Sequence, residues 1–250
     1  MSDTGAISIP PSTSSFRIGE VFNKSFSVFS RHAVPFIVLT AIAYIPLYIF
    51  AYLQAGRTGD IGAGTIIIGV LAFIGFLVCP VIASGAVVYG VVQDLRATSF
   101  SISDAVQVAL GRLLAMIGVA LCVGLICGLG TLLLVVPGVM LMCMYYVAAP
   151  VTIVEREGVF NSMSRSGALT KGHRWQIFGI IQLVVIVNLV IGAVLVGIGL
   201  ALGAVASAIM EQVWQVVVGA FNAVVSGVLY YQLRVAKEGV DINQIASVFD

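Results

Sequence analysis

Residues 113–154, LLAMIGVALCVGLICGLGTLLLVVPGVMLMCMYYVAAPVTIV, form a long apolar run that contains no charged side chain. At about 1.5 Å per residue, one helix of this length would measure about 60 Å, twice the roughly 30 Å hydrocarbon core of a bilayer. The run is interrupted by the Val-Pro-Gly sequence of residues 136–138, which favours a break in a helix. Charge stands at both ends, with Arg112 before the run and Glu-Arg-Glu at 155–157 after it. The stretch therefore predicts a helical hairpin inside a membrane.

The composition of the whole chain agrees with this class. Of the 250 residues, 60% are hydrophobic and 9% are charged. Soluble domains carry roughly a quarter charged residues, so a soluble fold would have too few charges for its surface. Residues 1–15 are polar and lack the basic start and apolar core of a signal peptide, so we expect a disordered N-terminal tail. Residues 16–250 are expected to form one helical membrane domain.

The uncharged runs predict an all-α, polytopic membrane protein with six transmembrane helices. The expected spans are residues 33–54, 61–93, 113–136, 139–154, 176–201 and 212–233. The second is too long for one perpendicular crossing and too short for two, so we expect one long helix that is bent at Pro80.

Amphipathic helices are predicted on the cytoplasmic side of the membrane, at residues 16–31, 99–112 and 158–171, with a short amphipathic segment at 241–249. The first has aromatic residues on one face and polar residues on the other. It is suited either to lying in the membrane interface or to packing on the protein's own helices, and the pattern does not choose between them.

Small residues spaced four apart predict where helices approach closely. Such pairs are Ala86 with Gly90, Gly124 with Gly128, and the series Gly219, Ala223 and Gly227.

The basic residues predict the orientation. With six crossings, 11 of the 12 basic residues fall on one side and only Arg57 falls on the other. Lysine and arginine favour the cytoplasmic side. We therefore predict a multi-pass protein of the bacterial inner membrane with both termini in the cytoplasm.

One group of charged residues is a candidate contact for lipid headgroups or for a cytoplasmic partner. It lies after the hairpin and contains Glu155, Arg165, Lys171, His173 and Arg174. Headgroup phosphates suit such a basic group. The alternative is that these residues are only the ordinary positive charge of a cytoplasmic loop.

Four polar residues lie inside the last two spans, Gln182 and Asn188 in the fifth and Gln215 and Asn222 in the sixth. They are suited to hydrogen bonds between helices or to lining the path of a solute. No acidic, basic or histidine side chain lies in the middle of a predicted span, although ion-coupled transporters commonly keep one there.

No motif for catalysis, a cofactor or a metal is found. The sequence contains no nucleophile motif, no phosphate-binding glycine loop and no paired carboxylates in a plausible pocket. The four cysteines lie inside apolar runs and lack the spacing of metal ligands. We therefore predict no catalytic, cofactor-binding or metal-binding residue.

Several short motifs resemble those of the bacterial glycerophosphoryl diester phosphodiesterase membrane-domain family. The resemblance covers most of residues 16–245 and is most specific in the second half. It is carried by Pro137-Gly138, YVAAP at 146–150, Glu155, Arg165-Ser166, LTKG at 169–172, WQIFG at 175–179, YYQLR at 230–234, KEG at 237–239 and Asp241.

The resemblance implies a helical membrane region that some relatives fuse to a soluble phosphodiesterase barrel. That barrel uses a His-Arg-Gly-type motif, acidic metal ligands and a divalent ion. Here His173-Arg174 is followed by Trp175, and we expect no room for a barrel in this chain. The phosphodiesterase activity is therefore not expected.

Three functions remain open at this stage. The favoured one is a non-enzymatic membrane module that organises lipids or a partner protein. Its partners would be membrane lipids and either another membrane protein or a second copy of the chain, but not nucleic acid. The second is a transporter or channel for a small uncharged or lipid-like solute. The third, and least favoured, is a lipid-processing enzyme.

Overall fold

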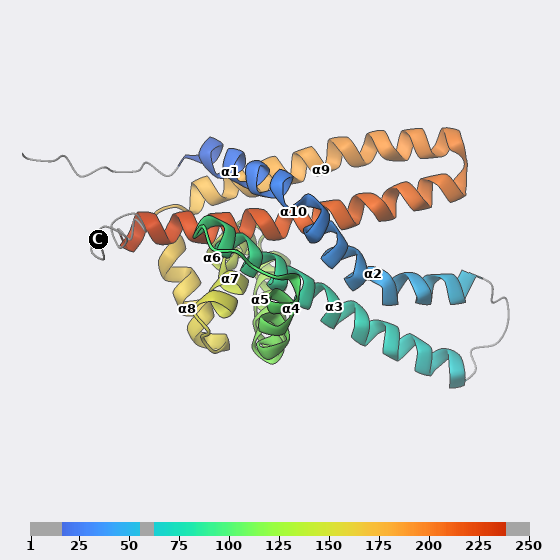
Figure 1. The fold of residues 1–250 in the computed structure, drawn as a ribbon, viewed down its shortest axis with the longest axis horizontal. Helices are drawn as coiled ribbons and strands as arrows, with labels where there is room; N and C mark the ends of the chain where they lie inside the picture. The colour runs from blue at the N-terminus through green and yellow to red at the C-terminus, as the bar shows by residue number, and fades with distance from the viewer. Residues whose placement is uncertain (1–16, 56–62, 239–250) are drawn as a thin grey trace, which may run out of the picture.

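The computed structural model describes residues 17–55 and 63–238, which form ten α-helices and no strand (Figure 1). The predicted all-α class is confirmed. The helices are α1 (Ile18–Arg31), α2 (Ala33–Ala55), α3 (Ala63–Leu95), α4 (Ile102–Gly111), α5 (Leu113–Leu133), α6 (Val135–Tyr145), α7 (Ala148–Val154), α8 (Val159–Thr170), α9 (Arg174–Leu202) and α10 (Ala204–Glu238).

The apolar helices have the lengths that a membrane requires. Among the described residues, five helices are long and apolar enough to cross, or six if the bent pair of α1 and the start of α2 counts as one span. The protein is therefore a multi-pass membrane protein. As predicted, α3 is one continuous helix with Pro80 inside it. The predicted tail at 1–15, the loop that holds Arg57 and a predicted amphipathic segment at 241–249 lie outside the described residues.

The core of the protein is built around α10. This helix packs on α1, α2, α3 and α9, and its last turns carry fully buried residues such as Val228 and Leu233. Close packing occurs at Gly227, where an added Cβ would lie 3.0 Å from a methyl group of Val91 in α3. Small residues at such points let two helix backbones approach each other.

The predicted close-packing pairs have different outcomes. Gly90 packs tightly, because an added Cβ would lie 2.8 Å from the ring of Phe100. By contrast, a Cβ added at Gly124 or Gly128 in α5 would meet nothing within 4 Å. The prediction of a contact at that pair was therefore wrong for this chain. Small residues at this spacing allow a second helix to pack closely, but they do not ensure that a second helix lies there.

Helix α1 packs on the protein's own helices. Val21, Ser25 and Val28 are buried, and the ring of Phe29 meets the ring of Phe221 in α10 edge to face at 5.5 Å. Phe26, by contrast, is 63% exposed. The sequence left two alternatives for this segment, and the structure shows the second of them, in which it packs on the protein's own helices α9 and α10.

The turn between α9 and α10 lies earlier in the chain than predicted. Gly203 makes this turn with a φ of +104°, which an L-residue rarely adopts. Next to it Gly199 packs against Ser207, where an added Cβ would lie 2.6 Å from the Cα atom. The expected start of the last span at residue 212 is therefore corrected to Ala204. The single charge of Glu211 does not end a helix that is already formed.

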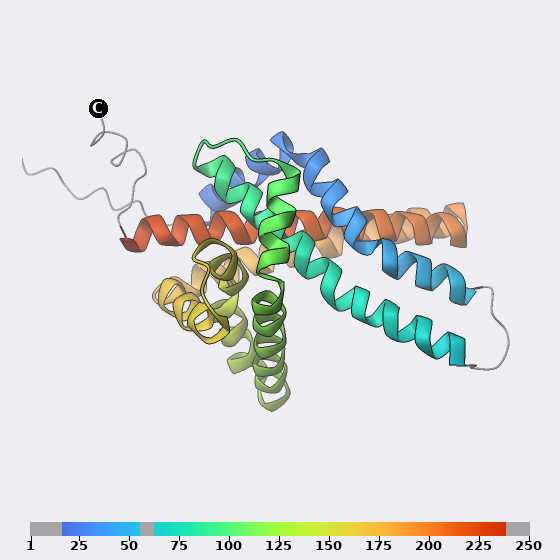
Figure 2. The same cartoon turned by 60° about the horizontal axis from the view of Figure 1, so that its bottom comes forward.

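The helices point in two main directions. Helices α9 and α10 run side by side along the long axis of the molecule, and the α2–α3 pair extends toward the same end as the α9–α10 turn (Figure 1). Helix α5 crosses the direction of α9 and α10 in both views (Figure 2). It packs on α3, α6, α7 and α8, so these helices form a group on one side of α10.

Candidate functional site

A charge network joins the end of α7 to α8 and to the last turns of α10. Glu155 follows α7 and is central to it: its Oε2 atom accepts a hydrogen bond from Arg165 Nε at 2.8 Å. Its Oε1 atom accepts one from the Tyr230 hydroxyl at 2.9 Å. Tyr230 itself is only 1% exposed. We call Glu155, Arg165, Tyr230, Arg234 and Glu238 the α8–α10 network.

Glu238 completes this network from the end of α10. One of its oxygens pairs with Arg165, and the other accepts from Arg234 Nε at 2.8 Å. The pKa of Arg165 is raised because hydrogen bonds to Glu155 and Glu238 stabilise the charged guanidinium. Two arginines face two glutamates, so the network has no net charge and its arginines are already paired.

Hydroxyl groups tie α8 to the break between α6 and α7. The carbonyl oxygen of Met144 accepts a hydrogen bond from Ser166 Oγ at 2.8 Å and lies 3.2 Å from Thr170 Oγ1, which also has Ser166 O as an acceptor at 2.9 Å. Both side chains are buried in α8. A helix break leaves carbonyl groups without their partners in the helix, and the Ser166 hydroxyl satisfies one of them. The end of α8, and the turn that follows it, are thereby held beside α6.

That turn positions the start of α9. Gly172 has a φ of +91°, a conformation that favours glycine just after the end of a helix, and Arg174 opens α9. His173 Nδ1 lies 2.8 Å from Gln176 Oε1, while Lys171 is exposed. Trp175 is 85% exposed. Such a tryptophan is typical of the interface between membrane and water.

A cavity of 280 Å³ opens between α6 and the start of α9. We call it the α6–α9 pocket. Arg174 contributes the only charged side chain among its described lining residues, and its Nε atom is buried without a hydrogen-bond partner. The rest of the wall is apolar apart from the indole of Trp175. The lining residues are Val135, Val136, Val139, Met140, Cys143, Arg174, Trp175 and Phe178.

The predicted headgroup contacts therefore separate into two sets. Glu155 and Arg165 are paired with each other inside the α8–α10 network. Lys171, His173 and Arg174 lie on the turn before α9 and at its first residue. Of the five, Arg174 is the one that lines a cavity with a polar atom unsatisfied.

The four polar residues predicted inside the last spans have separate environments. Asn188 accepts a hydrogen bond from Trp214 Nε1 at 3.0 Å, which links α9 to α10. Asn222 donates to Val218 O in its own helix at 3.0 Å. Gln182 and Gln215 are exposed on the helix surface. They therefore do not form one hydrogen-bonded cluster.

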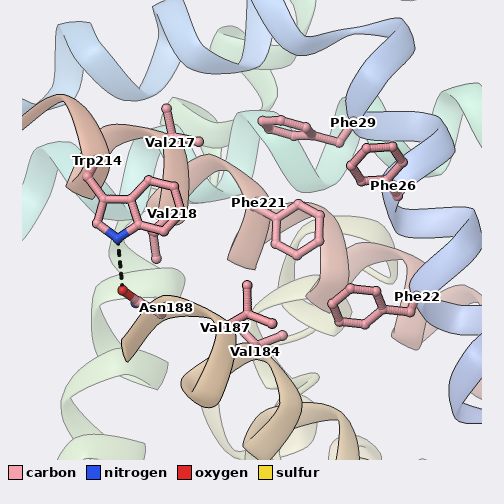
Figure 3. Close-up of a pocket in the computed structure, with 10 residues that line it drawn as sticks. All are labelled: Phe22, Phe26, Phe29, Val184, Val187, Asn188, Trp214, Val217, Val218 and Phe221. Carbon is pink, nitrogen blue, oxygen red and sulfur yellow. Dashed lines mark hydrogen bonds between the residues drawn. The ribbon is translucent and has the colours of Figure 1, made fainter. Parts of the chain in front are cut away.

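Asn188 and Trp214 also line a second cavity, of 240 Å³, between α1, α9 and α10 (Figure 3). Three phenylalanines of α1 and Phe221 of α10 surround it, and Asn188 and Trp214 form its polar edge (Figure 3). The indole N–H of Trp214 is bonded to Asn188 Oδ1, and the other lining residues of the cavity are apolar.

Sequence reasoning missed two sets of contacts. One is the hydrogen-bond contact at the α1–α2 bend, where His32 Nε2 lies 2.9 Å from Asp94 Oδ1 at the end of α3. The other is the α10 side of the network, although Tyr230, Arg234 and Glu238 follow one another at intervals of four. That spacing places them on one helix face and is a signal that the sequence contained.

Among residues 17–55 and 63–238, no group of three histidine, cysteine or acidic side chains is arranged to hold a metal ion. Cys79, Cys122, Cys127 and Cys143 are free thiols. No family model, curated protein or solved structure matches the chain. The class of the protein, an all-α multi-pass membrane protein, therefore rests on its sequence and fold.

Proposed function

We propose that the protein is a non-enzymatic protein of the bacterial inner membrane that binds phospholipid at the cytoplasmic ends of its helices. The observation that carries the proposal is the α6–α9 pocket, where an arginine with an unsatisfied polar atom borders an apolar cavity. The bias of basic residues supports the orientation, with both termini in the cytoplasm.

The pocket has the chemistry of an amphiphile site. A guanidinium binds phosphate oxygens through charged hydrogen bonds, and a buried donor without a partner is costly. Phosphate at Arg174 would remove that cost. Val139, Met140 and Phe178 offer apolar surface to an acyl chain that leaves the phosphate.

The neighbouring charges make Arg174 the specific contact. Arg165 and Arg234 are paired with glutamates, so they do not compete for a lipid phosphate. A transporter has less support, because Gln182 and Gln215 are exposed and Asn222 bonds to a carbonyl of its own helix.

The test is the affinity of the delipidated protein for phosphatidylglycerol, measured by native mass spectrometry in dodecyl maltoside. Charged hydrogen bonds contribute about 1.5–3 kcal/mol, so we expect Arg174→Gln to raise the Kd about 10- to 150-fold. Lys24→Gln is the matched control, because Lys24 is an exposed basic residue of α1 away from the pocket lining. Equal affinities of the two variants would refute the proposal, as would a delipidated wild-type protein that does not bind phosphatidylglycerol.

A further inference from the structure

The α5–α6 hairpin is closed tightly at an apolar tip. An alanine Cβ at Gly138 would lie 2.6 Å from the Cα atom of Thr131, so the two helix backbones touch there. The five residues that follow Thr131 are large, apolar and exposed, from 65% at Val135 to 83% at Leu132. Such a surface needs an apolar environment.

The residue that joins the two helices keeps both of its backbone groups bonded within the hairpin. Only Leu134 lies between the two helices. Its N–H donates to Gly130 O at 3.1 Å, and its carbonyl accepts from the Gly138 N–H at 3.3 Å. Thr131 Oγ1 donates to Cys127 O at 2.8 Å. Lipid-exposed irregular backbone is not tolerated in hydrocarbon, and here the break between the helices is limited to one residue whose N–H and carbonyl are both bonded.

The tip lies near the basic end of α9. Val135 and Val136 line the α6–α9 pocket together with Arg174 and Trp175. A compact cavity of 280 Å³ spans on the order of 10 Å, a third of the roughly 30 Å hydrocarbon core. A hairpin that crossed the bilayer would place its tip on the side opposite Arg174. Helix α5 runs across α9 and α10 and not along them, which agrees with a hairpin tip that lies close to Arg174 (Figure 2).

The two ends of the hairpin segment lie next to each other. Arg112, before α5, donates from Nη1 to the carbonyl oxygen of Arg156, after α7, at 3.1 Å. The charge bias does not distinguish the two arrangements, because residues 113–154 contain no charge. Moving the tip from the far side to the near leaflet moves no basic residue across the membrane.

From these observations we infer that the α5–α6 hairpin is re-entrant: it lies among the acyl chains of the cytoplasmic leaflet and does not cross. The chain then crosses four times, along α2, α3, α9 and α10, and both termini remain on one side. The exposed leucines of the hairpin bind the acyl chains of that leaflet. This inference uses the orientation proposed above but not lipid binding at Arg174.

The test is the labelling of single cysteines by a membrane-impermeant maleimide, in intact cells with a permeabilised outer membrane and in inverted vesicles. Leu133→Cys and Leu129→Cys report on the hairpin, in a background whose four native cysteines are replaced by alanine and whose elution on size exclusion matches wild type. Leu202→Cys, beside the α9–α10 turn, and Lys237→Cys, at the end of α10, mark the two sides.

We expect both hairpin cysteines to react at least tenfold more slowly than Leu202→Cys in cells and than Lys237→Cys in inverted vesicles. Nitroxide labels at the same positions should be more accessible to oxygen than to a soluble nickel chelate. Labelling of Leu133→Cys in cells at the rate of Leu202→Cys would show a full crossing and overturn the inference. Rapid labelling in inverted vesicles, or a disulfide between two copies at Leu133→Cys, would also overturn it. Arg174→Gln should leave the labelling pattern unchanged, so this test is separate from that of the lipid pocket.

Discussion

Removing one hydroxyl group, with Tyr230→Phe, tests whether the α8–α10 network holds the helices together. Tyr230 is 1% exposed, and its hydroxyl donates to Glu155 Oε1 at 2.9 Å. The Glu155 side chain is 15% exposed, so water replaces the lost donor poorly. A hydrogen bond to a charged group contributes about 1.5–3 kcal/mol, and we expect the free energy of unfolding to fall by that amount.

The assay is unfolding by SDS in dodecyl maltoside micelles, followed by circular dichroism. Tyr145→Phe is the matched control, because the Tyr145 hydroxyl makes no hydrogen bond in the described part of the chain. We expect a change of less than about 0.5 kcal/mol for this control. A loss for Tyr230→Phe no larger than that of the control would refute the reasoning.

A double-mutant cycle with Arg165→Met then tests the connection through Glu155. Both side chains bind Glu155, so the two losses should deviate from additivity by about 0.5–3 kcal/mol. The Arg165 side chain is 34% exposed, so solvent screens its ion pair with Glu155. We therefore expect Arg165→Met alone to lower the free energy of unfolding by less than the loss of one partner of a fully buried pair would. Additive losses would show that Glu155 does not link the two helices.

Two further predictions use the same unfolding assay. Gly138→Ala should lower the free energy of unfolding by about 1–3 kcal/mol, because its Cβ would lie 2.6 Å from the Thr131 backbone. Gly124→Ala, whose Cβ would meet nothing within 4 Å, should stabilise the protein by about 0.5–1 kcal/mol. Equal effects of the two substitutions would contradict the close contact at the tip. Ser166→Ala removes the side-chain donor that lies 2.8 Å from Met144 O and should cost about 0.5–1.5 kcal/mol. Exposed Thr98→Ser is a near-neutral control, and a neutral Ser166→Ala would contradict the role of that bond.

The long helices were predictable from the sequence because charge and Gly mark most of their ends. The predicted span at 33–54 is observed as Ala33–Ala55, and that at 176–201 as Arg174–Leu202. The start of α10 was not predictable in the same way. A helix that extends past the apolar run keeps its backbone hydrogen bonds, so polarity alone does not end it.

The candidate site was predictable in its residue types but not in its pairings. Arg165 and Glu155 stood out as charges beside an apolar run, and both are in the site. Their partners Tyr230 and Glu238 lie far along the chain, with 75 residues separating Tyr230 from Glu155. A periodic pattern identifies the face of a helix, but only packing brings that face to another helix.

The contrast between the two arginine environments is what connects the fold to the proposed function. Arg165 donates to two glutamates, so its charge serves to fix α8 against α10. That fixed α8 ends at Gly172, and the turn there sets where Arg174 enters the α6–α9 pocket. We therefore expect the network to affect the pocket only through the backbone that connects α8 to α9. If lipid binding depends on this placement, Tyr230→Phe should weaken phosphatidylglycerol binding less than Arg174→Gln does, and only to the extent that it loosens α8.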